Sequence, residues 1–233
     1  MKKNLKNIAL LIIASVTAAS CSTENSTTET PNYVPSAQAF AALQNAALSS
    51  VTQNYVLTAE NGITTFNSPK GVTIKINGGS LRKNGNPVTG SVDVKYIEVF
   101  DTGKMLTTDK TTMGLQANGQ MSLIISGGEF FIEAKQAGVL LTTVSPIELV
   151  IPGALTGGIN TAMRLWTGQL PAPQANMLGW IANDPGATGN GGVFANGQGT
   201  ISGGTYSASL PGFGWTWCRS GGYIASGRSG TWR

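Results

Sequence analysis

Apolar and polar residues alternate along the middle of this chain, and the alternation restricts the fold more than any other feature. Apolar and polar residues alternate cleanly from Val72 to Ile76 and again from Ser91 to Phe100. In the second segment, the charged residues are predicted to lie on the outer face of the sheet. Three further strands are predicted at Met121–Ile125, Glu129–Lys135 and Ile147–Ile151. The turn signals between strands are Asn77-Gly78-Gly79, Asn84-Gly85, Asp101-Thr102-Gly103, Asn118-Gly119 and Gly127-Gly128. Short strands at this spacing predict an all-β fold, an antiparallel β-sandwich, over residues 55–152.

Glycine becomes denser after Gly153, and the strand pattern weakens. Strands are predicted at Ala162–Thr167, Leu178–Ala182, Thr205–Leu210 and Phe213–Trp217. Asn183 to Thr200, rich in Gly and Asn, is predicted to be a loop. Residues 153–218 therefore form either a small second β module or a long Gly-rich β extension of the first.

One short helix is predicted before the sandwich, over residues 36–54. Ser36 is a suitable N-cap, and the segment is rich in alanine. Apolar residues recur at helical spacing at Phe40, Leu43, Ala47, Leu48 and Val51. We expect this stripe to pack against the sheet, with a partner-binding or membrane-surface role as the alternative.

The N-terminus has the three parts of an export signal. Lys2, Lys3 and Lys6 form a positive region, Ile8 to Val16 is apolar, and Ala18-Ala19-Ser20 supplies small residues for cleavage. The apolar run is too short to span a bilayer as a stable helix. Residues 1–20 are therefore predicted to be a signal peptide.

Small residues followed directly by Cys21 resemble the bacterial lipobox, which implies diacylglycerol on the Cys21 thiol and cleavage just before it. Several acyl chains on one residue give stable anchoring. Residues 21–35 are polar and predict a disordered tether, in which Glu24 and Glu29 weakly resemble surface-export signals. We expect an outer-membrane lipoprotein, with the periplasmic and surface faces both open; the alternative is a secreted protein with a chance cysteine.

The charge balance gives no reason to expect a nucleic-acid partner. The chain has 15 basic and 11 acidic residues, and removing residues 1–20 takes away three lysines and leaves 12 against 11. The expected partners are the membrane, through the lipid on Cys21, and an envelope protein or a glycan.

The chain contains no histidine, which excludes several kinds of chemistry. It rules out Ser-His-Asp and Cys-His nucleophiles, a histidine base, and metal sites with imidazole ligands. Carboxylate-based hydrolysis, calcium binding and pure ligand binding remain possible. We expect a protein that is not an enzyme and has no cofactor or metal.

Three groups of oxygen-bearing side chains could carry chemistry. Asp101-Thr102-Gly103 has the form of an aspartic-protease triplet, but a hairpin turn closed by Asp and Gly is favoured. Glu129 and Glu133 share a strand face and could form a glycosidase-type pair, although solvent-facing charges are commoner. Calcium is a weaker possibility, with ligands at Asn183, Asp184 and Asn190.

Four tryptophans and one cysteine lie within residues 153–218. The possible ligand-facing residues are Trp166, Trp180, Trp215 and Trp217. They could form a carbohydrate-stacking platform, but packing inside the protein is favoured because large aromatics are usually buried. Cys218 is either a small buried hydrophobe or half of an intermolecular disulfide.

A family resemblance runs from Phe66 to Pro152. The residues that carry it are Pro69-Lys70-Gly71-Val72, Gly85 to Gly90, Val92-Asp93-Val94, Glu98 to Asp101, Met113-Gly114 and Ser126 to Ala134. They resemble a family of uncharacterised bacterial surface lipoproteins whose β-sandwich is similar to carboxypeptidase-regulatory or ankyrin-associated modules. Because these are turn and core positions, the resemblance implies an architecture and no particular reaction. Beyond this stretch, Gly214 to Cys218 matches a Gly-Trp followed by Cys that the same family favours.

Residues 219–233 depart from this pattern. They are rich in Arg, Gly and Ser and show no strand pattern. The segment is either a flexible basic tail or the product of an out-of-frame or prematurely ended coding sequence. Taken together, the sequence predicts a lipid-anchored envelope protein with a non-enzymatic binding or structural role; the alternative is a glycan-binding or carbohydrate-active surface protein.

Overall fold

The computed structural model describes residues 36–108, 113–115, 121–123, 125–161, 163–169, 179–182 and 199–220. The predicted signal peptide, Cys21, the tether, the three calcium-ligand candidates and residues 221–233 lie outside these ranges. Within the described part of the chain, no helix is long and apolar enough to cross a membrane.

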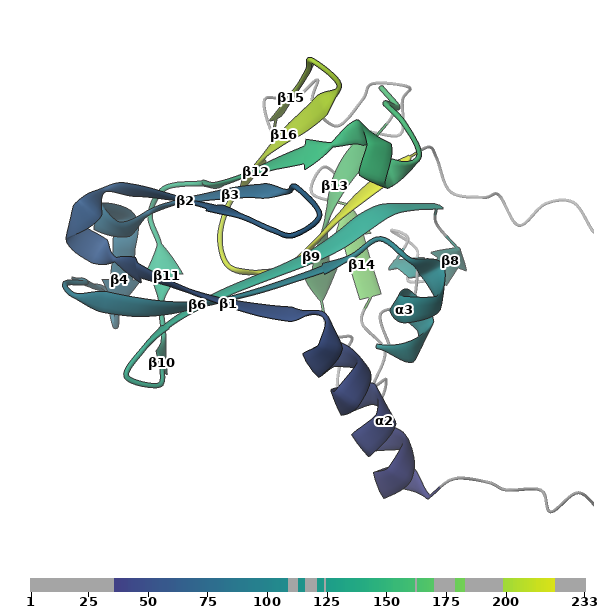
Figure 1. The fold of residues 1–233 in the computed structure, drawn as a ribbon, viewed down its shortest axis with the longest axis horizontal. Helices are drawn as coiled ribbons and strands as arrows, with labels where there is room; N and C mark the ends of the chain where they lie inside the picture. The colour runs from purple at the N-terminus through teal and green to yellow at the C-terminus, as the bar shows by residue number, and fades with distance from the viewer. Residues whose placement is uncertain are drawn as a thin grey trace, which may run out of the picture. The chain divides into compact units, whose positions relative to one another are not determined.

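Two large antiparallel sheets form the β-sandwich that the alternation predicts (Figure 1). Sheet A runs in the order β1 (Thr52–Thr58), β6 (Ser91–Val99), β9 (Ile125–Gln136), β17 (Gly214–Ser220), β13 (Met163–Gln169), β14 (Gly179–Ala182), β7 (Met113–Leu115) and β8 (Met121–Leu123), with β10 (Val139–Leu140) paired to β9. Sheet B runs in the order β15 (Gly199–Ser202), β16 (Thr205–Leu210), β12 (Ile147–Pro152), β3 (Thr73–Asn77) and β2 (Ile63–Asn67). A small third sheet contains β11 (Thr142–Thr143), β4 (Leu81–Lys83) and β5 (Asn86–Pro87).

Strands from the second half of the chain continue the same two sheets. β17 lies between β9 and β13 in sheet A, and β16 pairs with β12 in sheet B. The described strands beyond residue 153 therefore extend the two sheets of the sandwich. The pairing of β14 with β7 is parallel, and the other described strand pairs of these two sheets are antiparallel.

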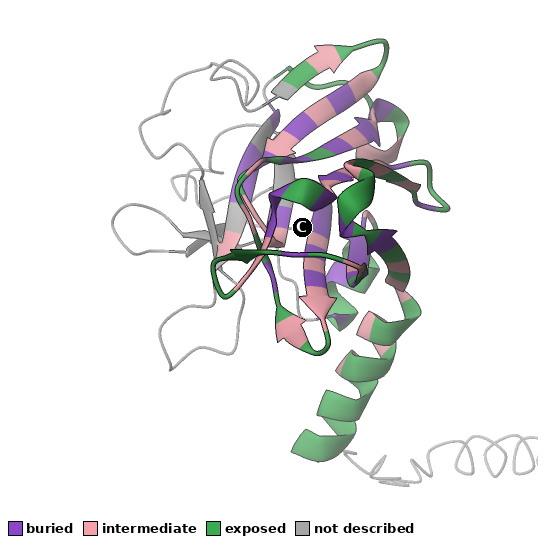
Figure 2. Ribbon diagram, turned by 90° about the vertical axis from the view of Figure 1, so that its left-hand side faces the viewer, coloured by how far each residue is buried: buried purple, intermediate pink, exposed green. Residues whose placement is uncertain are grey.

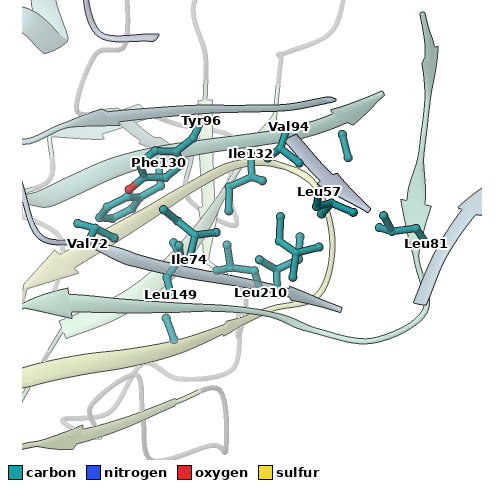
Figure 3. Packing of buried hydrophobic residues seen from close by; sticks show 14 of the residues in the cluster. Leu57, Val72, Ile74, Leu81, Val94, Tyr96, Phe130, Ile132, Leu149 and Leu210 are labelled. Carbon is teal, nitrogen blue, oxygen red and sulfur yellow. The ribbon is translucent and has the colours of Figure 1, made fainter. Parts of the chain in front are cut away.

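The main core lies between sheets A and B, as the inward positions of the alternation require. Figure 3 shows Tyr96, Phe130 and Ile132 of sheet A facing Ile74 and Leu149 of sheet B. All five side chains are at most 1% exposed. Apolar burial at about 25 cal/mol per Å² makes this interface the main source of stability.

The Asn84-Gly85 turn is confirmed in the β4–β5 hairpin. Both residues have positive φ, 51° and 85°, as a two-residue type I′ turn requires. Asn and Gly tolerate this backbone region better than other residues, so the dipeptide fixes the pairing of Lys83 with Asn86.

The described helices are α2 (Ala37–Ser50), α3 (Thr102–Thr107) and the short 3-10 turns η1 (Ala59–Asn61), η2 (Gly78–Ser80) and η3 (Gly153–Thr156). The predicted helix is present, but it ends earlier than residue 54. Thr52, Gln53 and Asn54 pair with β6 instead, because strand pairing satisfies their backbone groups in the sheet. α3 was not predicted from the sequence pattern.

The expected packing of the whole α2 stripe is wrong. Phe40 and Leu43 are 56% and 63% exposed, and α2 has no buried residue. Only the end of the stripe, Leu48 and Val51, packs against the buried cluster of Ile97, Val99 and Met105. Figure 2 shows most of the helix in the colour of exposed residues. The contact is limited because α2 leaves the sandwich at the start of β1 (Figure 1).

The prediction that β6 keeps its charges on the outer face fails at Glu98, which is 2% exposed. Its carboxylate accepts a hydrogen bond from Tyr96 Oη at 3.0 Å and another from Gln53 Nε2 at 3.4 Å. These donors offset part of the cost of burying a carboxylate. Ile97 and Val99 occupy the outer face instead, beneath the helices.

Tyr55 extends this polar cluster at the edge of the core. Its ring stacks on Phe66 with centroids 4.7 Å apart, and its hydroxyl donates to Gln53 Oε1 at 2.7 Å. Burial, and secondly the charge of Glu98, raises the pKa of Tyr55 above its usual value. The phenol therefore remains a hydrogen-bond donor at neutral pH.

Candidate functional site

A groove of about 540 Å³ lies on the outer face of sheet A, between that face and the C-terminal half of α2. Its apolar floor is a row across neighbouring strands. Ile97 of β6 pairs with Phe131 of β9, and Phe131 pairs with Trp215 of β17. Leu48 of α2 forms the apolar part of the opposite wall. Since paired residues share a face of a sheet, the strand register alone brings this row together.

The two aromatic rings on the floor contact each other. The centroids of Phe131 and Trp215 are 5.0 Å apart, and the ring planes are tilted by 41°. Both side chains are only half-buried, and they pack on the cluster of Ile97, Val99 and Met105. The ring pair therefore has a fixed support below and an accessible surface above.

Polar side chains surround this floor. Asn45 and Ser49 come from α2, Thr52 and Asn54 come from β1, and Lys95 comes from β6. The side chains supply amide, hydroxyl and ammonium groups, so the groove offers both hydrogen-bond donors and acceptors. None of the described residues that line it is a carboxylate.

Lys95 is weakly paired at the edge of the groove. Its register neighbour Glu133 makes a 2.6 Å ion pair with Lys135, whereas Lys95 Nζ lies 3.9 Å from the same carboxylate oxygen. Exposed pairs of this kind contribute about 0–1 kcal/mol. Since Glu133 is held mainly by Lys135, the Lys95 ammonium keeps hydrogen-bonding capacity for a ligand.

The four tryptophans lie on three strands of sheet A. Trp166 pairs with Trp217, and Trp180 pairs with Gly168. The side chains of Trp180 and Trp217 lie outside the described part of the structure. Trp166 is 2% exposed, whereas half-buried Trp215 lines the groove. Among the described tryptophan side chains, Trp215 is the one that a ligand in the groove can touch.

The triplet Asp101-Thr102-Gly103 begins a helix, so the prediction of a hairpin turn there is wrong. Asp101 Oδ1 accepts a hydrogen bond from the backbone N–H of Lys104 at 2.9 Å and caps α3. Asp is a favoured N-cap because its side chain satisfies an otherwise unpaired helix N–H. Asp101 is exposed, and it does not line the groove.

Glu129 and Glu133 lie on β9 as predicted, but in different surroundings. Glu129 is 0% exposed, which contradicts the expectation of two solvent-facing charges, and Glu133 is held by Lys135. Glu129 pairs in register with Val99 and Trp217 in the covered part of the outer face. Cys218 lies on β17 opposite Leu165 and Gly128, and its side chain is outside the described part.

Sequence reasoning missed Phe131, Lys95, Asn54 and Asn45 as site residues. Phe131 lies two residues from both glutamates, so period two already assigns it to their face. The alignment of β1, β6, β9 and β17 is what joins these positions, and that alignment depends on pairing between distant segments.

Comparisons with protein-family models, with curated proteins and with solved structures found no match for this chain. Among the described residues, no group of three or more His, Cys, Asp or Glu is placed to hold a metal ion. The fold and the groove define the molecule at the level of a β-sandwich with an aromatic-floored groove on one sheet.

Proposed function

We propose that this protein is a lipid-anchored component of the bacterial cell envelope with a non-enzymatic binding role, and that the groove on sheet A holds its ligand. The observation that carries the proposal is the half-buried Phe131–Trp215 pair, surrounded by polar side chains in a groove of about 540 Å³. Small-molecule sites have this mixture of apolar surface and a few polar groups, at about 300–1,000 Å³.

The groove is suited to binding because the sandwich fixes its floor. Ile97, Phe131 and Trp215 belong to three adjacent hydrogen-bonded strands, and Ile97 is 2% exposed. A fixed floor reduces the ordering cost on binding, because fewer side chains must be immobilised. The sequence features before residue 36, above all Cys21, support the envelope location.

Binding fits the surroundings of the glutamates better than catalysis by them. A glycosidase needs two carboxylates that both reach the scissile bond. Glu129 is completely buried, and Glu133 makes an ion pair with Lys135. For this reason we favour a binding protein over the carbohydrate-active enzyme that the sequence left as an alternative.

Replacing Cys21 by alanine should abolish lipid attachment, because the thiol that receives the acyl chains is removed. Cells grown with alkyne-tagged palmitate should label the wild-type protein and give no label on Cys21→Ala. Cys218→Ala is the matched control and should keep full label, since the chain has only these two cysteines. Label that persists on Cys21→Ala would contradict the anchoring proposal.

Photocrosslinking from the groove tests the binding role in living cells. A benzoylphenylalanine at position 45, inside the groove, should give a discrete crosslinked product after irradiation. The same residue at position 140 is the control, because Leu140 is 60% exposed on β10 and does not line the groove. Equal products from both positions, or no product from position 45, would contradict a ligand in this groove.

A further inference from the structure

We infer that the ligand of the groove is a saccharide of more than one ring, with one ring stacked on the indole of Trp215 and the hydroxyls of another bonded to Asn54, Asn45 and Lys95. This inference rests on the proposed function, since it names the class of molecule that occupies the same groove. Three properties of the groove support it: the aromatic floor, the kinds of polar group around it, and its length.

The floor suits the apolar face of a sugar ring. A pyranose presents C–H groups on its faces and hydroxyls around its edge, so it needs a flat apolar surface below and polar groups beside it. Trp215 provides such a surface, half-buried and supported by Phe131 at a centroid distance of 5.0 Å. Tryptophan combines a large apolar area with low conformational entropy, which favours it in such contacts.

The polar groups beside the floor match hydroxyls. A hydroxyl both donates and accepts, and an amide side chain such as Asn54 or Asn45 does the same. Lys95 adds an ammonium donor, which interacts only weakly with Glu133 because Lys95 Nζ lies 3.9 Å from Glu133 Oε1. With Lys95 at its edge and no carboxylate among its described lining residues, the groove does not favour a cationic ligand.

The length of the floor allows more than one sugar ring. The register joins the apolar residues Ile97, Phe131 and Trp215 across β6, β9 and β17, and polar Thr52 of β1 continues the row at one end. Three strand spacings give this row a length of about 14 Å. A second row, Asn54, Lys95 and Glu133, runs beside it. An apolar row next to a polar row suits a chain of rings that lies across the strands.

A peptide segment is the other occupant to consider. Peptides that bind sheets usually pair with an edge strand or place apolar side chains in pockets. The floor row is instead formed by the face of four paired strands, with only β1 at a sheet edge, and the polar residues around it are as prominent as the apolar ones. The groove therefore suits a saccharide better than a peptide, and a bound peptide is one of the outcomes that the test distinguishes.

Native affinity electrophoresis tests the inference with the full-length lipoprotein extracted in mild detergent. The gels contain glycogen, laminarin, xylan, mannan or chondroitin sulfate as the probe. At least one polysaccharide should retard the wild-type protein. Trp215→Ala should weaken that binding about tenfold or more, as expected for a central aromatic contact. Asn54→Ala, at an exposed position, should weaken it about fivefold by removing one hydrogen bond.

Two further variants separate loss of contact from loss of folding. Trp215→Phe keeps an aromatic surface and should retain most of the binding. Phe40→Ala removes an aromatic ring that is 56% exposed on α2 and outside the groove, so it should bind like the wild type. Thermal melting of each variant identifies any that has unfolded, and Asn54→Ala keeps the test valid if Trp215→Ala unfolds.

The outcomes distinguish the inference from the function on which it rests. If no polysaccharide retards the protein, or if Trp215→Ala and Asn54→Ala bind like the wild type, the saccharide inference is overturned. If the position-45 crosslinker nevertheless gives a groove-specific product that is a peptide, the proposed binding function stands and the ligand class is wrong. If that crosslinker also gives no product, both proposals fail.

Discussion

Replacing Phe130 by alanine should lower the free energy of unfolding by about 3–5 kcal/mol, the usual cost of removing a buried phenylalanine. Phe130 is 0% exposed on β9, in the middle of the main core. Its ring meets the edge of Phe100 at a centroid distance of 5.5 Å and an interplanar angle of 81°. The substitution removes this contact and leaves a cavity that the two sheets cannot fully close. Urea denaturation followed by circular dichroism measures the change.

Phe40→Ala is the matched control for this experiment. The same ring is removed, but from a position on α2 that is 56% exposed, so we expect a change of at most about 0.5 kcal/mol. A similar loss at both positions would mean that the sandwich core is not where the structure places it.

Gly78→Ala should destabilise the protein by about 1–3 kcal/mol because the backbone leaves no room for a side chain. A Cβ at position 78 would lie 2.4 Å from the carbonyl oxygen of Ala59, and Ala59 is itself 1% exposed. The N–H of Gly78 also donates to the carbonyl of Gly62 at 2.8 Å, which holds η2 against the β1–β2 connection. Relief of the clash would have to move one backbone segment away from the other.

Gly79 offers a control one residue away. A Cβ there would meet only the Asn77 side chain, at 3.4 Å, and the position is exposed. Gly79→Ala should therefore change stability by less than about 1 kcal/mol, because a glycine in an ordinary backbone conformation accepts alanine. Thermal melts of both variants decide the matter, and equal melting temperatures would contradict the close approach of η1 and η2.

Strand alternation predicted much of the fold because it records which side of a sheet is buried. Val92 and Val94 face the core as the pattern requires, and the strand at Thr205–Leu210 has the predicted bounds. The pattern failed where α2 and α3 cover part of the outer face of sheet A. Ile97 and Val99 are buried on the outer face under the helices, so Glu98 lies on the inner face and depends on Tyr96 for a hydrogen bond.

The candidate site was harder to predict than the fold. Trp215 was identified because tryptophan is conspicuous in any sequence, but Phe131 looked like one apolar residue in a strand. Their contact depends on the register of β9 with β17, two strands about eighty residues apart whose pairing no local pattern specifies. The N-cap role of Asp101 was missed for another reason, since Asp and Gly favour turns and helix starts alike.

The position of β17 has a consequence for how this chain acquires its structure. β17 is the last strand described, yet it lies between β9 and β13 near the middle of sheet A. Until residues 214–220 have been synthesised, β9 and β13 present unpaired edges, which are prone to pairing with other chains. Contacts between such distant segments also slow folding. We therefore expect the sandwich to complete in a late step, with the ring of Trp215 reaching the groove only as sheet A closes.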